Sequence, residues 1–438
     1  MGIAKLLARP ARRDYEQAVL LNVVLGILAV LSLGLLLWQW LAALRFPLHQ
    51  RRTDRSYAPA VTVLKPLKGA DDELEACLRS WFAQDYAGPV QILLGTHLAE
   101  DSAGPVVNKL LAEFPDRDAR LVLTGEDLGT NGKVSNLAQL ARHAKHEVFV
   151  ISDGDIRVPR DFLTNAVLPL SSRKGGEGRG EEANSSKLPS PQPSPRLGGE
   201  REKDNVSGAT SASAEVGLVN CFYRLANPST PAMHWEAIAI NADFWSQVLQ
   251  SKTLKPLDFA LGAVMVTRRS NLREIGGFEA LLDCLADDYQ LGHRIAKQGH
   301  RIELCPVVVE CWHAPQTWGA VWKHQLRWAR TVRVCQPAPY FFSILSNPTL
   351  WPLVWLMAQP GILSAGFFGA ALVARILITE NLSWQLTQKS GGAAPLLAPL
   401  KDLLQFALWL GAFLGHTVEW RGQRFHLRRD GTLAKLTP

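Results

Sequence analysis

The sequence predicts an α/β protein, with a mostly parallel sheet covered by helices on both faces, held at a membrane by two or three apolar helices. Two observations lead to this prediction. Between residues 59 and 335, segments patterned as buried strands alternate with segments of helical period. Long uncharged stretches precede and follow that block, at 18–44, 350–374 and 403–418.

The first uncharged stretch has the length of a transmembrane helix. Residues 18–44 carry no charged side chain, and only Asn22 and Gln39 interrupt the apolar run. About 20 helical residues cross a hydrocarbon core of ~30 Å. The run is too long for a cleaved signal peptide, and no clear small-residue cleavage site follows it. We therefore predict a membrane helix at 18–44 behind a basic tail at 1–17.

The C-terminal stretches are less regular. Residues 350–374 contain Pro352 and Pro360, which membrane helices tolerate. The shorter stretch at 403–418 could span, lie in the interface or be re-entrant. We assign 336–420 to a membrane region with one or two spans and 421–438 to a basic cytoplasmic tail. Within that region, "PAPYFFSIL" at 337–345 is either an interfacial strip or a buried loop.

Strand and helix alternate in the intervening block, which forms one domain at 59–335. The expected strands are "AVTVLKPLKG", "VQILLGTH", "RLVLTG", "EVFVIS" and "VGLVNCFYRL", with "ELEACLRSWFAQ" and "KVSNLAQLARHA" as helices. Residues 171–215 contain no aromatic side chain and are rich in Ser, Gly, Pro and charge. We predict a disordered insertion there. A linker between two domains is the alternative, but neither half would make a complete sheet alone.

The charge distribution points to a membrane and away from nucleic acid. The formal net charge is only +7 over 438 residues. The cationic side chains flank the apolar stretches: Lys5, Arg9, Arg12 and Arg13; Arg45, Arg51, Arg52 and Arg55; and Arg421, Arg424, Arg428 and Arg429. The six cysteines show no C-x-x-C pair and no His/Cys metal spacing, so we expect reduced thiols in a cytosolic compartment.

Acidic side chains follow two of the expected strands, at the sheet edge where parallel sheets bind ligands. Glu100 and Asp101 follow the strand at 91–95, and Asp153 and Asp155 follow the strand at 147–152. Carboxylates two residues apart repel each other unless a cation lies between them. Mg²⁺ or Mn²⁺ shared with a phosphate is one explanation, and a solvated Asp-Gly turn is the other.

Three further motifs accompany these aspartates. Lys133 opens a helix whose N-terminal amides favour an anion, and Asp287 and Asp288 precede another helix. Arg327 and Trp328 stand at the centre of "HQLRWARTVR". Singly, each has an ordinary explanation, as a helix cap or a surface cation–π pair. Their order along one α/β block favours a binding and catalytic site.

The block resembles the family 2-like glycosyltransferases of GT-A fold, most closely the ceramide glucosyltransferase group. The motifs that carry the resemblance are "VTVLKPLKGADDELEACLRSWFAQDY", "LGTNGKVSNL", "ISDGDIRV", "LGAVMVTRRSNLREIGGF", "ADDYQLGHRIAKQG" and the Arg-Trp pair, within residues 61–333. Within this group the chain is most similar to the bacterial hopanoid glycosyltransferases, partly through the closing "TVEWRGQRFHL".

The resemblance implies a role for each matching residue. Lys65, Asp101, Lys133 and Asp153 would bind the nucleotide sugar, and Asp153 with Asp155 would hold Mg²⁺ or Mn²⁺ against its diphosphate. Asp288 would be the general base, and Arg327 and Trp328 would form the last catalytic motif. Two positions depart from the family: His324 stands where Gln or Arg is usual, and Asp155 is acidic where many ceramide transferases are not.

These expectations describe a membrane-bound, inverting glycosyltransferase. It would move a sugar, glucose or N-acetylglucosamine, from a UDP-sugar to a lipid hydroxyl, with a hopanoid as the favoured acceptor and ceramide or another lipid as the alternative. The partners would be the donor, the lipid and the bilayer. We expect a multi-pass protein of the bacterial inner membrane whose catalytic block faces the cytosol, where sugar nucleotides are made.

Three competing functions share part of this pattern. A processive polysaccharide synthase has the same motifs but needs more spans to form a translocation channel. A polyprenyl-phosphate sugar transferase would differ only in its acceptor. An inert, membrane-anchored nucleotide-binding protein would lack the base, whereas Asp288 is present.

Overall fold

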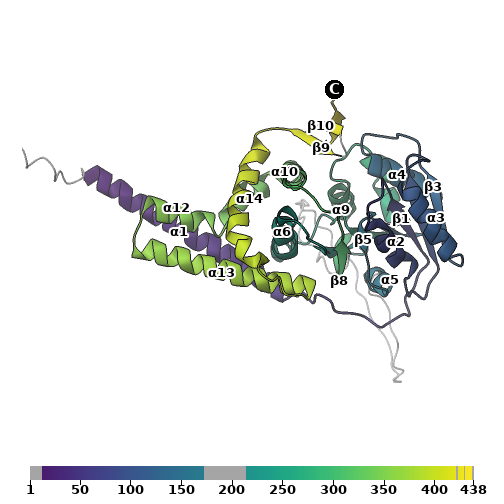
Figure 1. Ribbon diagram of the computed structural model, residues 1–438, viewed down its shortest axis with the longest axis horizontal. Helices are drawn as coiled ribbons and strands as arrows, with labels where there is room; N and C mark the ends of the chain where they lie inside the picture. Colours follow the sequence, from purple (N-terminus) through teal and green to yellow (C-terminus); the bar gives the residue numbers. More distant parts are fainter. Residues whose placement is uncertain (1–11, 172–213, 421–422, 429, 437–438) are drawn as a thin grey trace, which may run out of the picture.

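The computed structural model describes residues 12–171, 214–420, 423–428 and 430–436, and consists of an α/β domain and a helical arm (Figure 1). The predicted insertion at 171–215 falls almost entirely outside the described residues, as does most of the predicted N-terminal tail. Each prediction about those two segments therefore stays a prediction.

One eight-stranded sheet forms the centre of the α/β domain, in the order β3-β2-β1-β4-β7-β6-β8-β5. Its parallel pairs are β1 with β2, β1 with β4, β2 with β3, and β6 with β8. β7 is antiparallel to β4 and β6, and β5 is antiparallel to β8. The strands are β1 (Val61–Pro66), β2 (Val90–Thr96), β3 (Asp118–Leu123), β4 (Val148–Ser152), β5 (Ile156–Arg157), β6 (Val216–Leu225), β7 (Val264–Arg268) and β8 (Arg301–Cys311).

Helices cover both faces of this sheet, and the first and fourth strands are buried throughout. On one face, Val63 of β1 belongs to a core cluster with Trp81 and Leu163. On the other face, Leu64 joins a second cluster with Val134 and Trp245. A strand covered on both sides needs an unbroken apolar run, which explains why "VTVL" and "VFVI" do not alternate with polar residues. The predicted α/β class with a mostly parallel sheet is confirmed.

The helices of this domain connect the strands or follow them. They are α2 (Leu74–Phe82), α3 (Ala103–Glu113), α4 (Gly132–Arg142), α5 (Phe162–Val167), η1 (Leu168–Ser171), α6 (Pro231–Ile238), the π-helix η2 (Ala239–Phe244), α7 (Trp245–Leu254), α8 (Arg269–Glu274), η3 (Phe278–Leu281), α9 (Asp287–Lys297) and α10 (Trp318–Cys335). The boundaries of the predicted domain, 59–335, enclose β1 to α10.

The arm contains α1 (Arg12–Leu44), α12 (Leu350–Ala358) and α13 (Ile362–Thr387), and η5 (Ala394–Leu397) with α14 (Ala398–Phe413) lies at its base (Figure 1). Three helices among the described residues are long and apolar enough to cross a membrane: Tyr15–Leu44, Ile362–Thr387 and Ala394–Phe413. A fourth candidate is the pair Pro337–Ser346 and Leu350–Ala358, which is bent by 57°. This agrees with the upper count of the prediction.

The bounds of the C-terminal membrane segments differ from those predicted. No single helix covers 350–374, because the chain breaks between Ala358 and Ile362. Pro360 lacks the amide hydrogen that a continuing helix needs, and Gly361 favours the break. The segment predicted at 403–418 is helical only to Phe413, since the chain enters a strand at Thr417.

The segment at 337–345 is helical. It forms α11 (Pro337–Phe342) and η4 (Ser343–Ser346). Tyr340 is buried, whereas Phe341 and Phe342 are 52% and 60% exposed. Two neighbouring exposed aromatic rings favour the interfacial strip over the buried loop.

The described part of the predicted basic tail at 421–438 contains strands, and its cytoplasmic location stays a prediction. The chain forms a three-stranded antiparallel sheet of β9 (Thr417–Trp420), β10 (Gln423–Leu427) and β11 (Leu433–Lys435). Phe425 and Leu427 alternate with exposed residues and pack on Leu285. The alternation of a half-buried strand was present in "QRFHL", but the arginines dominated the composition of the tail.

Candidate active site

Lys133 joins two of the predicted acidic clusters at the carboxyl edge of the sheet. Its Nζ lies 2.7 Å from Asp153 Oδ1, after β4, and 3.3 Å from Asp287 Oδ2, at the start of α9. The lysine side chain is 9% exposed. Burial alone would lower the pKa of Lys133, but the two carboxylates raise it above its ordinary value. The site therefore holds a fixed positive charge between two acids.

Local structure positions this lysine. Asn131 is the N-cap of α4, and its side chain accepts hydrogen bonds from the backbone N–H groups of Lys133 and Val134. The Asn131 amide also donates to Cys284 O at 2.8 Å, and Thr130 N donates to Asp283 Oδ1 at 2.9 Å. The start of α4 is thus tied to the segment that leads into α9, which brings Lys133 and Asp287 together.

Asp155 points to a pair of residues that sequence analysis missed. His313 Nε2 lies 3.1 Å from Asp155 Oδ2, and Cys311 Sγ lies 3.5 Å from the same oxygen. β5 pairs with the end of β8, so Ile156 stands opposite Cys311. The available signal was a Cys-x-His pattern at the end of a strand. The third group, Asp155, is far away in sequence, so no short His/Cys spacing reveals the cluster.

These side chains have the donor chemistry for a divalent cation. One ligand atom from each of Asp155, Cys311 and His313 lies within 4.8 Å of the others. Asp155 Oδ1 is buried without a hydrogen-bond partner, which is the state of a carboxylate oxygen left for a cation. Burial raises the pKa of the Cys311 thiol, and a soft sulfur ligand is poorly suited to the hard cations Mg²⁺ and Mn²⁺. Asp155 and His313 are the better donors of this cluster, and Asp153 lies outside it, paired with Lys133.

The two aspartates of this motif differ in their electrostatics. Burial raises the pKa of Asp153, and the Lys133 charge only partly opposes that shift. Burial would also raise the pKa of Asp155, but the hydrogen bond and charge of His313 leave it below its ordinary value. Asp155 is therefore ionised and held by an imidazole, whereas Asp153 is held by an ammonium group.

Lys65 bonds to the turn that contains Asp153. It is fully buried at the end of β1, and its Nζ donates to Ser152 Oγ at 3.2 Å and to the Asp153 carbonyl oxygen. Burial lowers the pKa of Lys65 to about 8. With no exposed surface, this side chain contacts the backbone of the Asp153 turn. The expected place of Lys65 in a nucleotide-sugar site stays a prediction.

Asp288 lies beside Asp287 at the start of α9. Its Oδ1 accepts a hydrogen bond of 2.8 Å from Tyr289 N. A β-carbon at Gly262 would come within 2.7 Å of Asp288 Oδ2, so the absence of a side chain at that glycine leaves room for the carboxylate. Burial and the charge of Asp287 raise the pKa of Asp288 to about 6. A carboxylate with that pKa is suited to accept a proton near neutral pH.

Asp101 lies at the same edge but contacts a different loop. Its carboxylate accepts hydrogen bonds from Gly69 N at 2.9 Å and from Ala103 N at 2.9 Å. Gly69 has a φ of 73°, a conformation that other residues rarely adopt. The contacts of Asp101 order the loop after β1 and the start of α3. Its expected place near a nucleotide base stays a prediction.

The Arg327–Trp328 motif lies on α10 and is supported by a buried acid. The Trp328 ring contacts the His324 ring at a centroid distance of 4.6 Å and the Phe244 ring at 6.2 Å. His324 Nδ1 lies 2.7 Å from Glu236 Oε1, and Gln325 donates to the same oxygen at 2.8 Å. Glu236, on α6, is fully buried and was not predicted. His324 thus links the buried acid to the tryptophan.

The C-terminal sheet contacts α10 and the segment that leads into α9. Leu433 N donates to Asp283 O at 2.8 Å and Leu285 N donates to Gly431 O at 3.2 Å, just ahead of α9. Lys323 of α10 pairs with Glu419 of β9 at 3.0 Å. The segment that carries Asp287 and Asp288 therefore contacts the chain terminus on one side and the start of α4 on the other.

Comparison with known proteins agrees with this geometry. The model of a family described as Glycosyl transferase family 21 matches residues 24–177 and 205–433. Ceramide glucosyltransferase from Candida albicans is 34% identical over 143 residues, which make up 29% of this chain and 26% of that enzyme. Ceramide glucosyltransferase 3 from Caenorhabditis elegans is 21% identical over 423 residues, 94% of this chain and 82% of the relative.

Among solved structures, the chain is similar to a mannosyltransferase from Pyrobaculum calidifontis that was determined with GDP-Man and Mn²⁺. The sequence identity is 22% and the TM-score 0.49, over 88% of this chain and 99% of that one. The matched residues of the family model run from α1 to β11, and the predicted α/β class with helices long and apolar enough to cross a membrane is confirmed.

Proposed function

Because the chain belongs to glycosyl transferase family 21, we propose that this glycosyltransferase moves a sugar from a UDP-sugar to the hydroxyl group of a membrane lipid. The observation that carries the proposal is the position of Lys133 between two acids. Both Asp153 and Asp287 lie within 3.3 Å of its ammonium group. One lysine thereby joins the proposed donor site to the segment that carries the proposed base.

The donor half of the site would bind a diphosphate. Asp155 and His313 are the clustered residues that would hold Mg²⁺ or Mn²⁺, and Asp153 is the proposed third ligand. When bound, such a cation would offset the negative charge that develops on the leaving diphosphate. Lys133 is positioned to add a second positive charge there, and Arg327 is the proposed third. Lys65 keeps the Asp153 turn in place through the backbone carbonyl.

The acceptor half would remove a proton. Asp288 would accept the hydrogen of the lipid hydroxyl as its oxygen attacks the anomeric carbon. The site then has one base and no separate carboxylate nucleophile in this proposal, so a single displacement inverts the anomeric centre. Trp328, held by His324 and Phe244, would form a wall of the pocket for the sugar or the acceptor.

We propose a sphingolipid as the acceptor in preference to a hopanoid. The relatives reported above are named ceramide glucosyltransferases, and one of them aligns over 94% of this chain. This supports ceramide, or a lipid alcohol like it, which sequence analysis had placed second. A processive polysaccharide synthase is disfavoured, because the described residues offer three or four candidate spans for a translocation channel. We also propose that the catalytic domain faces the cytosol, where UDP-sugars are made.

The proposal is tested by incubating the purified full chain in lipid nanodiscs with radiolabelled UDP-glucose, UDP-N-acetylglucosamine or GDP-mannose. Each donor is paired with ceramide, a hopanoid tetrol or a polyprenyl phosphate, and the extracted lipids are counted. We expect the largest transfer with a UDP-sugar and ceramide, and none with Asp153→Asn. Transfer only to polyprenyl phosphate, or only from GDP-mannose, would contradict the proposed substrates.

Removal of a metal donor is expected to weaken cation binding directly. We predict that Asp155→Asn and His313→Gln each lower the affinity for Mn²⁺ in the presence of UDP by about tenfold or more. Electron paramagnetic resonance of free Mn²⁺ measures this without relying on turnover. Cys311→Ser is the matched control and should have a smaller effect, because a soft thiol is a poor ligand for Mn²⁺. Unchanged Mn²⁺ affinity in Asp155→Asn would remove this residue from the metal site.

A further inference from the structure

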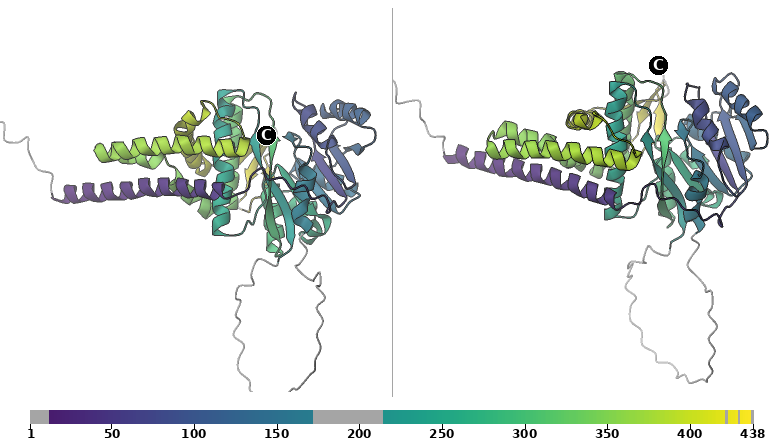
Figure 2. Two further views of the ribbon diagram at one scale, coloured as in Figure 1. Left: turned by 90° about the horizontal axis from the view of Figure 1, so that it is seen from below. Right: turned by 60° about the horizontal axis from the view of Figure 1, so that its bottom comes forward.

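The α12–α13 hairpin and α1 lie side by side in the arm, with α1 extending farther from the catalytic domain (Figures 1 and 2). Trp355 of α12 donates to Asn22 Oδ1 of α1 at 2.7 Å, and Trp40 of α1 donates to Asn381 Oδ1 of α13 at 2.8 Å. Trp355 also contacts Phe367 of α13. These contacts show that α13 runs in the same direction as α1, whereas α12 runs in the opposite direction.

The tip of the hairpin is apolar and satisfies its own backbone. Met357, Ile362 and Leu363 are 75%, 96% and 72% exposed. Ser364 is buried; its Oγ donates to Gln359 O at 2.7 Å and accepts from Gly361 N at 3.1 Å. In water the exposed apolar side chains of this tip would be unfavourable, and water could bond to its backbone groups without any internal partner. In hydrocarbon both features are required.

The exposed part of the hairpin is too short to cross a bilayer. From Ile362 to Arg375, a helix rise of 1.5 Å per residue gives about 20 Å, against a hydrocarbon core of ~30 Å. Beyond Arg375, α13 enters the core of the catalytic domain, where Ile378, Leu382 and Leu386 belong to the same cluster as Trp245. The 26 residues of α13 therefore include a half that packs on protein.

In contrast to the hairpin, α1 is long enough to cross a bilayer. α1 meets the catalytic core at Leu36, and Gln39 bonds to Ser246 Oγ at 2.6 Å. From Tyr15 to Leu36 the helix extends about 30 Å, which matches the hydrocarbon thickness. Tyr15 and Glu16 then lie at the far end, as expected for side chains that reach the second interface.

A third observation concerns α14, which lies across the base of the arm and not along it (Figures 1 and 2). Leu396, Leu400 and Leu410 are exposed along η5 and α14. Lys401 and Asp402 are buried, where Lys401 bonds to Asp243 and Asp402 accepts from Arg375. A helix with one apolar exposed face and one polar buried face suits the plane of a membrane interface.

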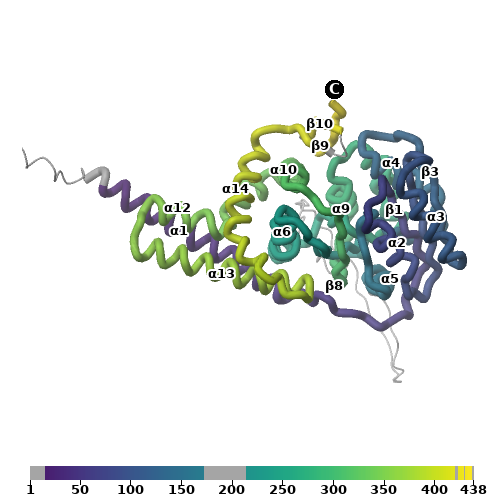
Figure 3. Tube along the Cα trace, in the orientation of Figure 1, coloured from purple at the N-terminus to yellow at the C-terminus, as the bar shows by residue number. Residues whose placement is uncertain are grey.

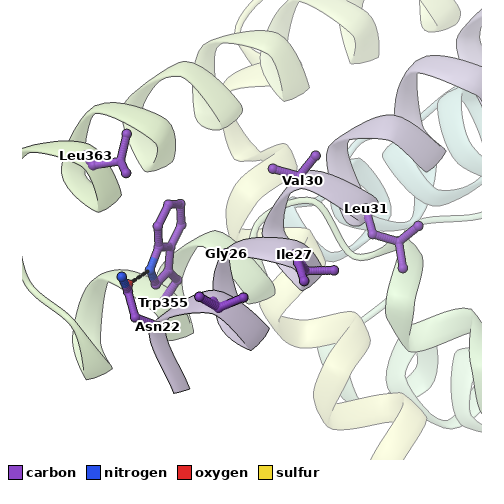
Figure 4. A pocket seen from close by; sticks show the side chains of 8 residues that line it. Asn22, Gly26, Ile27, Val30, Leu31, Trp355 and Leu363 are labelled. Carbon is purple, nitrogen blue, oxygen red and sulfur yellow. Dashed lines mark hydrogen bonds between the residues drawn. The ribbon is translucent and has the colours of Figure 1, made fainter. Parts of the chain in front are cut away.

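An open pocket of about 570 Å³ lies between α1, α12 and α13 (Figure 4). It is lined by Asn22, Val23, Gly26, Ile27, Val30, Leu31, Trp355 and Leu363. The only polar side chains that it contains, Asn22 and Trp355, bond to each other. The remaining lining is apolar and open to the outside of the arm, which suits the acyl chains of bilayer lipids.

We infer that the α12–α13 hairpin is a re-entrant membrane element, which enters the bilayer from the catalytic side and returns to it. Within the described residues, α1 is then the single helix that crosses, and α14 lies in the interface. The hairpin and α14 form a lipid-facing surface that seats the catalytic domain on one leaflet. This arrangement places residue 12 and the C-terminal sheet on opposite sides of the membrane.

Labelling of single cysteines distinguishes this topology from a spanning hairpin. Cys335 is the one cysteine that is not buried, so Cys335→Ser serves as the background. Met357→Cys and Ile362→Cys report on the tip, Tyr15→Cys on the far end of α1, and Leu436→Cys on the catalytic side. An impermeant maleimide is added to the full chain in sealed vesicles of either orientation, and again after denaturation in SDS.

We expect Tyr15→Cys and Leu436→Cys to be labelled from opposite sides. Both tip variants should react at least tenfold more slowly than either control from both sides, and fully after denaturation. A tip that is labelled from the Tyr15 side would show that the hairpin crosses the membrane. A tip that is labelled from the Leu436 side would show that it lies in water, and either result would overturn the inference.

Discussion

Replacement of Asp288 by asparagine is expected to lower kcat by about 10²–10⁴-fold while UDP-sugar affinity stays within about twofold of wild type. The proposed role of Asp288 is to accept the acceptor proton, and the asparagine amide cannot do so. Asp153, in contrast, contacts Lys133 on the donor side, so Asp153→Asn should weaken donor binding as well. Calorimetry with the UDP-sugar and turnover on a lipid acceptor separate the two effects.

The pH dependence of turnover offers a second readout for the same residue. Burial and Asp287 raise the pKa of Asp288 to about 6. A base acts in its deprotonated form, so kcat should be constant above that pH and fall tenfold per pH unit below it. Asp287→Asn removes the neighbouring negative charge, so the acid limb of the profile should move to lower pH.

Asp287→Asn is also the matched control for the assignment of the base. Asp287 contacts Lys133 at 3.3 Å, so its loss should cost some activity, but less than the loss of Asp288. If Asp287→Asn is inactive and Asp288→Asn keeps near-normal turnover, the base is Asp287. The profile of the remaining active variant would then show whose titration limits the reaction.

Much of the α/β domain was predictable because its signals are local. β6 occupies the predicted strand at 216–225, and α4 begins beside Lys133 at the predicted helix start. The positions of Asp101 and Asp153 at one sheet edge follow from the rule for parallel strands. Each of these predictions depends on a short window of residues whose period or capping is visible in the chain.

The missed residues depend on contacts between distant segments. His313 meets Asp155 through the pairing of β5 with β8, and Glu236 meets His324 through the packing of α6 on α10. Neither partner can be identified from a short motif. The hairpin at 350–387 was missed for another reason: a hydropathy window measures apolar length, and it does not report that Pro360 and Gly361 reverse the chain.

Arg375→Ala is expected to destabilise the folded chain by about 3–5 kcal/mol, because it leaves buried carboxylates without their partner. The guanidinium of Arg375 bonds to Asp243 Oδ1 at 2.8 Å and to Asp402 Oδ1 at 2.7 Å. Lys401 Nζ lies 2.6 Å from Asp243 Oδ2, and the four side chains are nearly inaccessible to solvent. Two positive and two negative charges thus balance between η2, α13 and α14.

This cluster connects α13 of the arm to η2, next to the residues of the active site. Asp243 precedes Phe244, whose ring contacts Trp328. A loss of Arg375 should therefore loosen α13 from the domain and also disturb the Arg327–Trp328 motif. Thermal unfolding in detergent, followed by a dye that reports buried cysteines, measures the stability, and donor and acceptor KM values measure the effect on the site.

Two variants make the experiment specific to an unpaired buried charge. Arg79→Ala removes a partly exposed arginine that pairs with Glu75 and Glu113, and it should leave the unfolding temperature almost unchanged. Arg375→Met combined with Asp402→Asn removes one charge of each sign, and should be more stable than Arg375→Ala although both variants lack the same ion pairs. If Arg375→Ala unfolds at the wild-type temperature, the buried charges do not hold α13 to the catalytic domain, and the contacts of Ile378 and Leu382 with the core must provide that attachment.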